Sequence, residues 1–246
     1  MSDIDYLEIG EGLRLAYRHR TGRGPTLIFL PGYMSDMEGT KATALDEWAE
    51  REGRALLRFD YSGCGISEGE FGVQSLASWR ADVLAMIDEV VEGPVVLVGS
   101  SMGGWLMLLA ALARPQRVVG LVGIAAAADF TSWGFTTEQK IDILQHGRIE
   151  ESSPYGGAPY VTTRTFWESG ETLRLLHSEI PIECPVRLLH GQADADVPWP
   201  WSLEVMKQLR SADVQATFVK GGDHRLSRTS DLALLIATVN GLLEAL

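Results

Sequence analysis

Hydrophobic and polar positions alternate along the chain in two ways. Short, almost continuously apolar runs predict strands that are covered on both faces of a sheet. These runs occupy residues 13–17, 26–30, 55–59, 95–98, 118–124, 186–189 and 216–219. Between several of them, apolar residues recur every three or four positions, which predicts helices. Strands that alternate with helices predict a mostly parallel sheet flanked by helices.

Three helices are predicted from this spacing. One is carried by apolar positions between Leu76 and Val90, and another by apolar positions between Leu232 and Leu242. The third spans about 102–113 and ends before Pro115, because the residue that precedes a proline avoids the α region.

Residues 129–180 break this rhythm with prolines, paired glycines and scattered aromatic residues. We predict that this segment is a small helical lid insertion within a single domain that spans residues 1–246. The alternative is a helical excursion that only caps the core.

Composition and charge exclude several classes of protein. Hydrophobic residues make up 46% of the 246 positions and charged residues 22%, which is typical of an ordered globular domain. The net charge of −12 argues against binding to nucleic acid or to an anionic membrane surface. No apolar stretch is typical of a transmembrane segment. We expect a monomer, although nothing in the sequence specifies the oligomeric state.

The first residues and the cysteines add two expectations. Residues 1–5 are acidic and lack the apolar core of a signal peptide, so we predict a cytoplasmic protein. Cys64 and Cys184 lie 120 positions apart and form neither a zinc motif nor a thioredoxin-like motif. We therefore predict no metal ion and no organic cofactor.

A candidate nucleophile lies between residues 99 and 103, where Gly-Ser-Ser-Met-Gly matches the pattern G-x-S-x-G. The bare pattern is weak, because a Gly/Ser turn before a helix also produces it. Here it follows the strand predicted over 95–98 and begins a predicted helix, which is the setting of a nucleophile elbow. Ser101 occupies the central position of the pattern and Ser100 does not.

Chain order selects the partners of this serine. In this architecture an Asp or Glu follows the nucleophile, and a His follows the acid. Asp194 lies in a turn after a predicted strand and is the first candidate for the acid, with Asp196 as the alternative. Of five histidines, His224 alone lies beyond both residues and is the candidate base. We predict a structural role in the turn for His190.

Two backbone N–H groups are candidates for an oxyanion hole. One belongs to Met102, directly after the nucleophile, and the other to Tyr33, in the loop after the strand predicted over 26–30. An ordinary Pro-Gly turn is the alternative for that loop. Aromatic residues in the insertion and after the acid loop could form the substrate pocket or only pack the core; they are Trp133, Trp199 and Trp201.

Longer stretches of the chain carry a family resemblance. Residues 29–42, 58–69, 97–115, 187–199 and 223–225 resemble the α/β-hydrolase superfamily, and within it the abhydrolase-domain-containing mitochondrial depalmitoylases and acyl-glucuronide esterases. The resemblance implies an α/β-hydrolase fold with nucleophile Ser101, acid Asp194 and base His224. It also implies hydrolysis of small acyl esters or thioesters, including the S-acylated cysteine of a protein. Residues 129–180 match only loosely.

Two other functions are compatible with the same residues. The triad could serve perhydrolysis or the hydrolysis of a carbon–carbon bond, because fold and triad do not fix the reaction. A ligand-binding protein without catalysis could also use this fold. A serine, an acid and a histidine in the right order argue against a protein without catalysis, and the resemblance implies a serine esterase or thioesterase.

Overall fold

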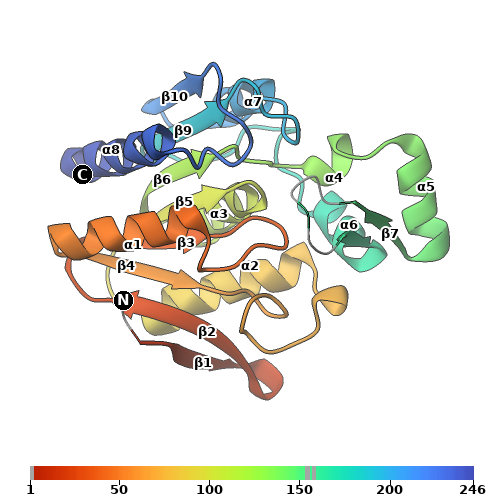
Figure 1. The fold of residues 1–246 in the computed structure, drawn as a ribbon, viewed down its shortest axis with the longest axis horizontal. Helices are drawn as coiled ribbons and strands as arrows, with labels where there is room; N and C mark the ends of the chain where they lie inside the picture. Colours follow the sequence, from red (N-terminus) through yellow and green to blue (C-terminus); the bar gives the residue numbers. More distant parts are fainter. Residues whose placement is uncertain (1–2, 153–155, 157–158) are drawn as a thin grey trace.

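A single eight-stranded sheet organises the structure (Figure 1). The computed structural model describes residues 3–152, 156 and 159–246. Strand order across the sheet is β1-β2-β4-β3-β5-β6-β9-β10. β2 pairs antiparallel with both β1 and β4, and every other pair of neighbours is parallel, so the predicted mostly parallel sheet is confirmed. The strands are β1 (Asp5–Ile9), β2 (Leu13–Arg20), β3 (Arg23–Leu30), β4 (Arg54–Phe59), β5 (Val95–Ser100), β6 (Val118–Ile124), β9 (Val186–Gly191) and β10 (Val214–Val219).

Helices cover both faces of this sheet and create two cores. Along β5, Val95 and Leu97 pack into one core, whereas Val96 and Val98 pack into the other, because successive strand side chains point to opposite faces. The first core lies under α2 (Leu76–Ala85), α3 (Met102–Ala113) and α7 (Pro200–Gln208). The second lies under α1 (Thr40–Glu52) and α8 (Thr229–Ala245). Among the described residues, no helix combines the length and apolarity needed to cross a bilayer.

All seven predicted strands form, and the differences from the prediction have physical reasons. β1 escaped detection because it is an edge strand with mostly exposed side chains, which leaves little apolar signal. The helix predicted from Leu76 to Val90 forms as α2, but its last turn widens into a π-helix over Met86–Val90. Two short 3₁₀ turns, at Gly10–Gly12 and Phe71–Val73, complete the elements of the sheet domain.

The segment between β6 and β9 projects from one end of the sheet (Figure 1). It contains the helices α4 (Phe130–Trp133), α5 (Thr137–His146) and α6 (Arg164–Thr172). It also contains an antiparallel hairpin of β7 (Arg148–Glu151) and β8 (Tyr160–Thr163), so the insertion is not wholly helical as expected. Residues 153–155 and 157–158 of the predicted insertion, and residues 1–2 of the acidic N-terminus, lie outside the described residues.

Partly buried hydrogen bonds join the two ends of this insertion to one another and to α3. At its start, the carboxylate of Asp129 accepts hydrogen bonds from the backbone N–H groups of Leu175 and Leu176 at its end. The indole N–H of Trp105 on α3 donates to the carbonyl of Leu173. The insertion is therefore a packed part of the domain.

The close approach of α3 to β3 depends on one glycine. A Cβ at Gly103 would overlap the carbonyl oxygen of Leu30, and both are backbone positions that cannot swing aside. Gly241 in α8 provides a contrast, because a Cβ there would meet nothing within 4 Å.

We therefore predict opposite effects of the same substitution in two helices. Gly103→Ala should lower the free energy of unfolding by about 1–3 kcal/mol, because it forces backbone apart in a packed region. Gly241→Ala should raise it by roughly 0.5–1 kcal/mol, since alanine is the better helix former. Urea unfolding followed by circular dichroism measures both, and a neutral Gly103→Ala would contradict the packing argument.

Candidate active site

Ser101 occupies a strained turn between β5 and α3. Its backbone has φ +55° and ψ −120°, a conformation that costs a non-glycine residue free energy. Three backbone hydrogen bonds hold it there: its N–H donates to Ile124, and its carbonyl accepts from Gly104 and Ala127. The turn lifts the side chain above the end of the sheet, next to the N-terminus of α3.

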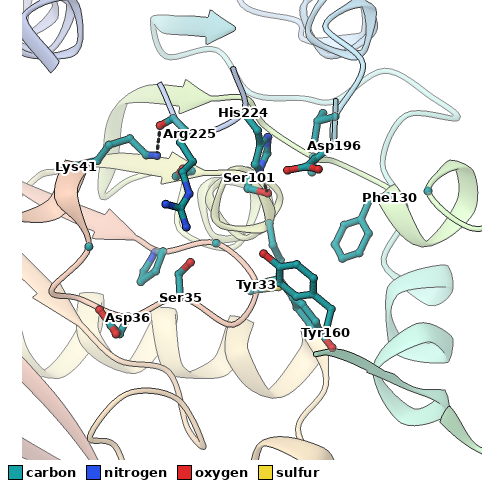
Figure 2. A pocket seen from close by; sticks show the side chains of 18 of the residues that line it. Tyr33, Ser35, Asp36, Lys41, Ser101, Phe130, Tyr160, Asp196, His224 and Arg225 are labelled. Atoms are coloured by element: carbon teal, nitrogen blue, oxygen red, sulfur yellow. Dashed lines mark hydrogen bonds between the residues drawn. The ribbon is translucent and has the colours of Figure 1, made fainter. Parts of the chain in front are cut away.

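Ser101 is hydrogen-bonded through His224 to Asp194. The Ser101 hydroxyl lies 3.1 Å from Nε2 of His224, and Nδ1 of His224 lies 2.8 Å from Oδ2 of Asp194. The three residues come from the loops that follow β5, β9 and β10. Because the carboxyl ends of parallel strands meet at the same edge of a sheet, residues 123 positions apart can touch. Figure 2 shows Ser101 and His224 facing one another at the pocket.

The carboxylate of Asp194 is surrounded by hydrogen-bond donors. Oδ1 accepts from the backbone N–H groups of Asp196 and Val197 at 2.9 and 2.8 Å. Oδ2 faces the imidazoles of His224 and His190 at 2.8 and 3.2 Å. Burial alone would raise the pKa of Asp194, but the bonds from His190 and His224 outweigh it and hold that pKa well below its usual range. The side chain therefore stays ionised, oriented towards His224.

Asp196, the alternative acid, lines the same pocket. Among the described residues, Asp194, Asp196 and His224 are the group whose potential metal-ligand atoms lie within 4.8 Å of one another. The oxygens of Asp194 already face four N–H groups, whose positive ends oppose a bound cation. Four N–H donors around one carboxylate stabilise its negative charge and leave no favourable place for a metal ion beside it.

The loop after β3 passes directly beside the serine. A Cβ at Gly32 would lie 3.2 Å from Cβ of Ser101, so the chain at Gly32 and Tyr33 runs within contact distance of the candidate nucleophile. Met102 begins α3, where backbone N–H groups have no helical partner. The phenol of Tyr33 points away and donates to the carbonyl of Val161 on β8 at 2.6 Å.

A cavity of about 510 Å³ opens in front of Ser101. Aromatic side chains of the insertion line one part of it, among them Phe130, Trp133 and Tyr160. Lys41 and Arg225 line another part (Figure 2). The ammonium of Lys41 donates to the carbonyl of Arg225 at 2.5 Å, and burial together with the charge of Arg225 lowers the pKa of Lys41 to about 8.

The three predicted pocket tryptophans have different positions. Trp133 is among the described residues that line the cavity, whereas Trp199 and Trp201 are not, which favours the packing alternative for these two. Trp201 stacks on Trp133 with ring centroids 4.9 Å apart, and Trp199 packs edge-on against Phe218. Their rings are used in packing α7 against the insertion and β10.

Sequence reasoning missed three residues around the site. His190 touches Asp194 and was expected only to shape the turn. Lys41 and Arg225 line the cavity, and Arg225 directly follows His224 in a stretch that carries the family resemblance. Nothing in the spacing of Lys41 indicates that α1 begins beside the site.

Comparisons with known proteins point to one family of enzymes. A family model described as serine aminopeptidase S33 matches residues 24–140. Mitochondrial palmitoyl-protein thioesterase ABHD10 from Mus musculus is 44% identical over 249 residues, covering 100% of this chain and 84% of that protein. The human relative is also 44% identical and is covered over 81% of its length. The structure of mouse alpha/beta hydrolase domain-containing protein 10 superposes with a TM-score of 0.93 at 43% identity, covering 99% of both chains.

The prediction of a cytoplasmic protein is contradicted by these comparisons. The relatives that match over the full chain are named as mitochondrial proteins. The acidic residues near the N-terminus misled the prediction because they belong to the folded domain: β1 begins at Asp5. The charge of Asp5 belongs to an exposed position of an edge strand and does not indicate location.

Both cysteines should be unreactive in the folded protein. Burial raises the pKa of the Cys64 thiol to about 12 and that of the Cys184 thiol to about 11, and the thiolate is the reactive form. We predict that iodoacetamide alkylates the native protein only slowly at pH 8 and rapidly after unfolding in guanidinium. Mass spectrometry counts the modified thiols, and stoichiometric alkylation of the native protein at pH 8 would contradict the burial argument.

Proposed function

The chain belongs to the ABHD10 family of α/β-hydrolases, and we propose that it is a serine hydrolase that cleaves acyl thioesters and carboxyl esters through an acyl-enzyme. The observation that carries this proposal is the continuous hydrogen-bond chain from Ser101 through His224 to Asp194. A serine hydroxyl is a weak nucleophile by itself, and this arrangement supplies the adjacent base that activates it.

In the first half-reaction, Ser101 Oγ attacks the acyl carbonyl carbon and its proton moves to Nε2 of His224. Asp194 accepts the Nδ1–H of His224, which fixes the tautomer and stabilises the imidazolium. The backbone N–H groups of Tyr33 and Met102 donate to the oxyanion of the tetrahedral intermediate. When the intermediate collapses, His224 returns the proton to the departing sulfur or oxygen.

The second half-reaction regenerates the enzyme. A water molecule gives a proton to Nε2 of His224 and attacks the carbonyl carbon of the acyl-Ser101 ester. The new tetrahedral intermediate uses the same two N–H donors, and its collapse releases the carboxylic acid and restores the Ser101 hydroxyl. Besides the chain and the substrate, these steps use only that water molecule.

The two sides of the cavity suggest how a substrate would bind. The aromatic side chains of Phe130, Trp133 and Tyr160 offer apolar contact for an acyl group. The part of the cavity lined by Lys41 and Arg225 suits the polar leaving group. We propose a small acyl ester or thioester as substrate, and the S-acylated cysteine of a protein where the cavity mouth admits a peptide. The insertion would act as the lid of this site.

The proposal is tested by removing the nucleophile. Ser101→Ala should lower kcat by about 10⁴-fold or more and should abolish labelling by a fluorophosphonate. The substrates are acyl thioesters and oxygen esters with acyl chains of graded length, together with an amide of one matched acyl group. Turnover that survives in the purified variant would exclude Ser101 as the nucleophile.

A matched control for this variant is Ser100→Ala, which removes the neighbouring hydroxyl of the same motif. Ser100 is the last residue of β5 and is not part of the hydrogen-bond chain described above. It should keep both turnover and labelling. If wild type is labelled but cleaves no member of the panel, the proposed substrate class is wrong.

The two acid candidates are separated by a pair of isosteric variants. Asp194→Asn should lower kcat by roughly 10³–10⁴-fold, because an amide that donates to Nδ1 of His224 leaves Nε2 protonated and unable to accept from Ser101. Asp196→Asn should change kcat by less than about threefold, since Asp196 contributes its backbone N–H to Asp194. Steady-state kinetics measures both; the opposite ranking would assign the acid to Asp196.

A further inference from the structure

A second imidazole, that of His190, contacts the same carboxylate oxygen of Asp194 as His224 does. His190 is the second-to-last residue of β9, and its side chain is fully buried. Nε2 of His190 lies 3.2 Å from Oδ2 of Asp194 and 2.9 Å from the carbonyl oxygen of Val197. Its other nitrogen, Nδ1, lies 2.7 Å from the hydroxyl of Ser202, which is also buried.

These neighbours fix the tautomer of His190. A carbonyl and a carboxylate can only accept, so the nitrogen that faces both of them must carry the hydrogen. The opposite nitrogen of the neutral ring is then an acceptor, and the Ser202 hydroxyl donates to it. The result is a directed chain in which Ser202 donates to His190 and His190 donates to Asp194.

Both chains end on one oxygen atom. His224 and His190 each donate to Oδ2 of Asp194, while Oδ1 accepts the backbone N–H groups of Asp196 and Val197. A carboxylate offers about four acceptor sites, so this set of donors holds its plane in one orientation. The bond from His190 also takes up part of the negative charge that would otherwise act on His224.

We propose that His190, supported by Ser202, is a positioning residue for the reaction: it orients Asp194 and sets how strongly Asp194 attracts the proton on His224. This inference rests on the proposed function, because it assigns His190 to the same triad. His190 does not touch the substrate, and no covalent step passes through it. Its effect is transmitted through Oδ2 of Asp194.

The consequence for pH dependence has a definite sign. Without the His190 donor, Oδ2 concentrates its charge on His224 and favours the protonated imidazole, which cannot accept from Ser101. As the pH is lowered, activity should then be lost at a higher pH than in wild type. The other charged residues that line the pocket with His224 are Asp36, Lys41, Glu151, Asp196 and Arg225, and Asp223 precedes His224 in the chain. All of these are kept in the variants below.

The first experiment compares two substitutions at position 190. His190→Leu removes the donor at similar volume, whereas His190→Gln places an amide N–H near the former Nε2. We expect the kcat of His190→Leu to be about tenfold below wild type, with KM within about twofold of wild type. The acid limb of its activity–pH profile, where activity is lost as the pH falls, should lie about half a pH unit higher. We expect His190→Gln to recover most of kcat and the wild-type acid limb.

Circular dichroism shows whether His190→Leu folds. If it does not, a second pair of variants tests the same proposal. Ser202→Ala removes only the hydroxyl that polarises His190 and should move the acid limb the same way by a smaller amount. Ser211→Ala is the matched control, because Ser211 is a buried serine before β10, at the opposite end of that strand from the site. It should leave the pH profile unchanged.

The rate of fluorophosphonate labelling against pH gives a readout that needs no turnover. It reports the same Ser101–His224 pair, so a failure of the substrate assignment stays separate from a failure of the positioning role. An unmoved acid limb in folded His190→Leu and in Ser202→Ala would overturn the proposal. So would a His190→Gln variant as impaired as His190→Leu, because the donor would then not be the group that matters.

Discussion

The structure depends on the absence of side chains where α3 crosses the ends of β3 and β5. A Cβ at Gly103 would overlap the carbonyl of Leu30, and a Cβ at Gly99 would overlap the backbone of Gly103. Because neither position has a side chain, α3 starts close above the sheet, and Ser101 adopts a turn with positive φ. That contact also brings the loop at Gly32 against Ser101, so one packing constraint places the candidate nucleophile beside the candidate oxyanion-hole loop.

A second constraint acts at the neighbouring strands. β9 and β10 are parallel and adjacent, so their following loops lie next to one another and bring Asp194 to His224. The Asp194 carboxylate is then buried with four donors around it, and their hydrogen bonds outweigh the rise in its pKa that burial causes. Its charge and orientation are therefore set jointly by the loop after β9, including Val197, and by His190 in β9 itself.

The insertion is coupled to this site through Tyr33. The backbone of Tyr33 passes beside Ser101, while its ring packs among Phe71, Trp79, Phe130 and Phe166. Its hydroxyl bonds to Val161 on β8, and burial raises the pKa of that phenol far above its usual value, so it stays a donor. The position of the hairpin and the position of the candidate oxyanion donor are linked through one residue, and both elements line the cavity in front of Ser101.

Local sequence patterns determined the parts of this protein that local physics controls. Apolar runs marked seven strands because strands buried on both faces need them, and the G-x-S-x-G turn with the order Ser, Asp, His pointed to Ser101, Asp194 and His224 as candidates. The edge strands β1 and β7 left no comparable signal because most of their side chains are exposed. The short strand β8 and the π turn after α2 left none because their geometry depends on packing.

Only the tertiary structure decided which distant groups meet. It placed Trp199 and Trp201 in packing contacts away from the cavity and brought Lys41 from α1 to its wall. It also brought His190, which the sequence predicted only to shape the turn, into contact with the carboxylate of Asp194. The physical reason is that the direction of a side chain depends on neighbours far away in the sequence, and spacing along one chain does not encode those neighbours.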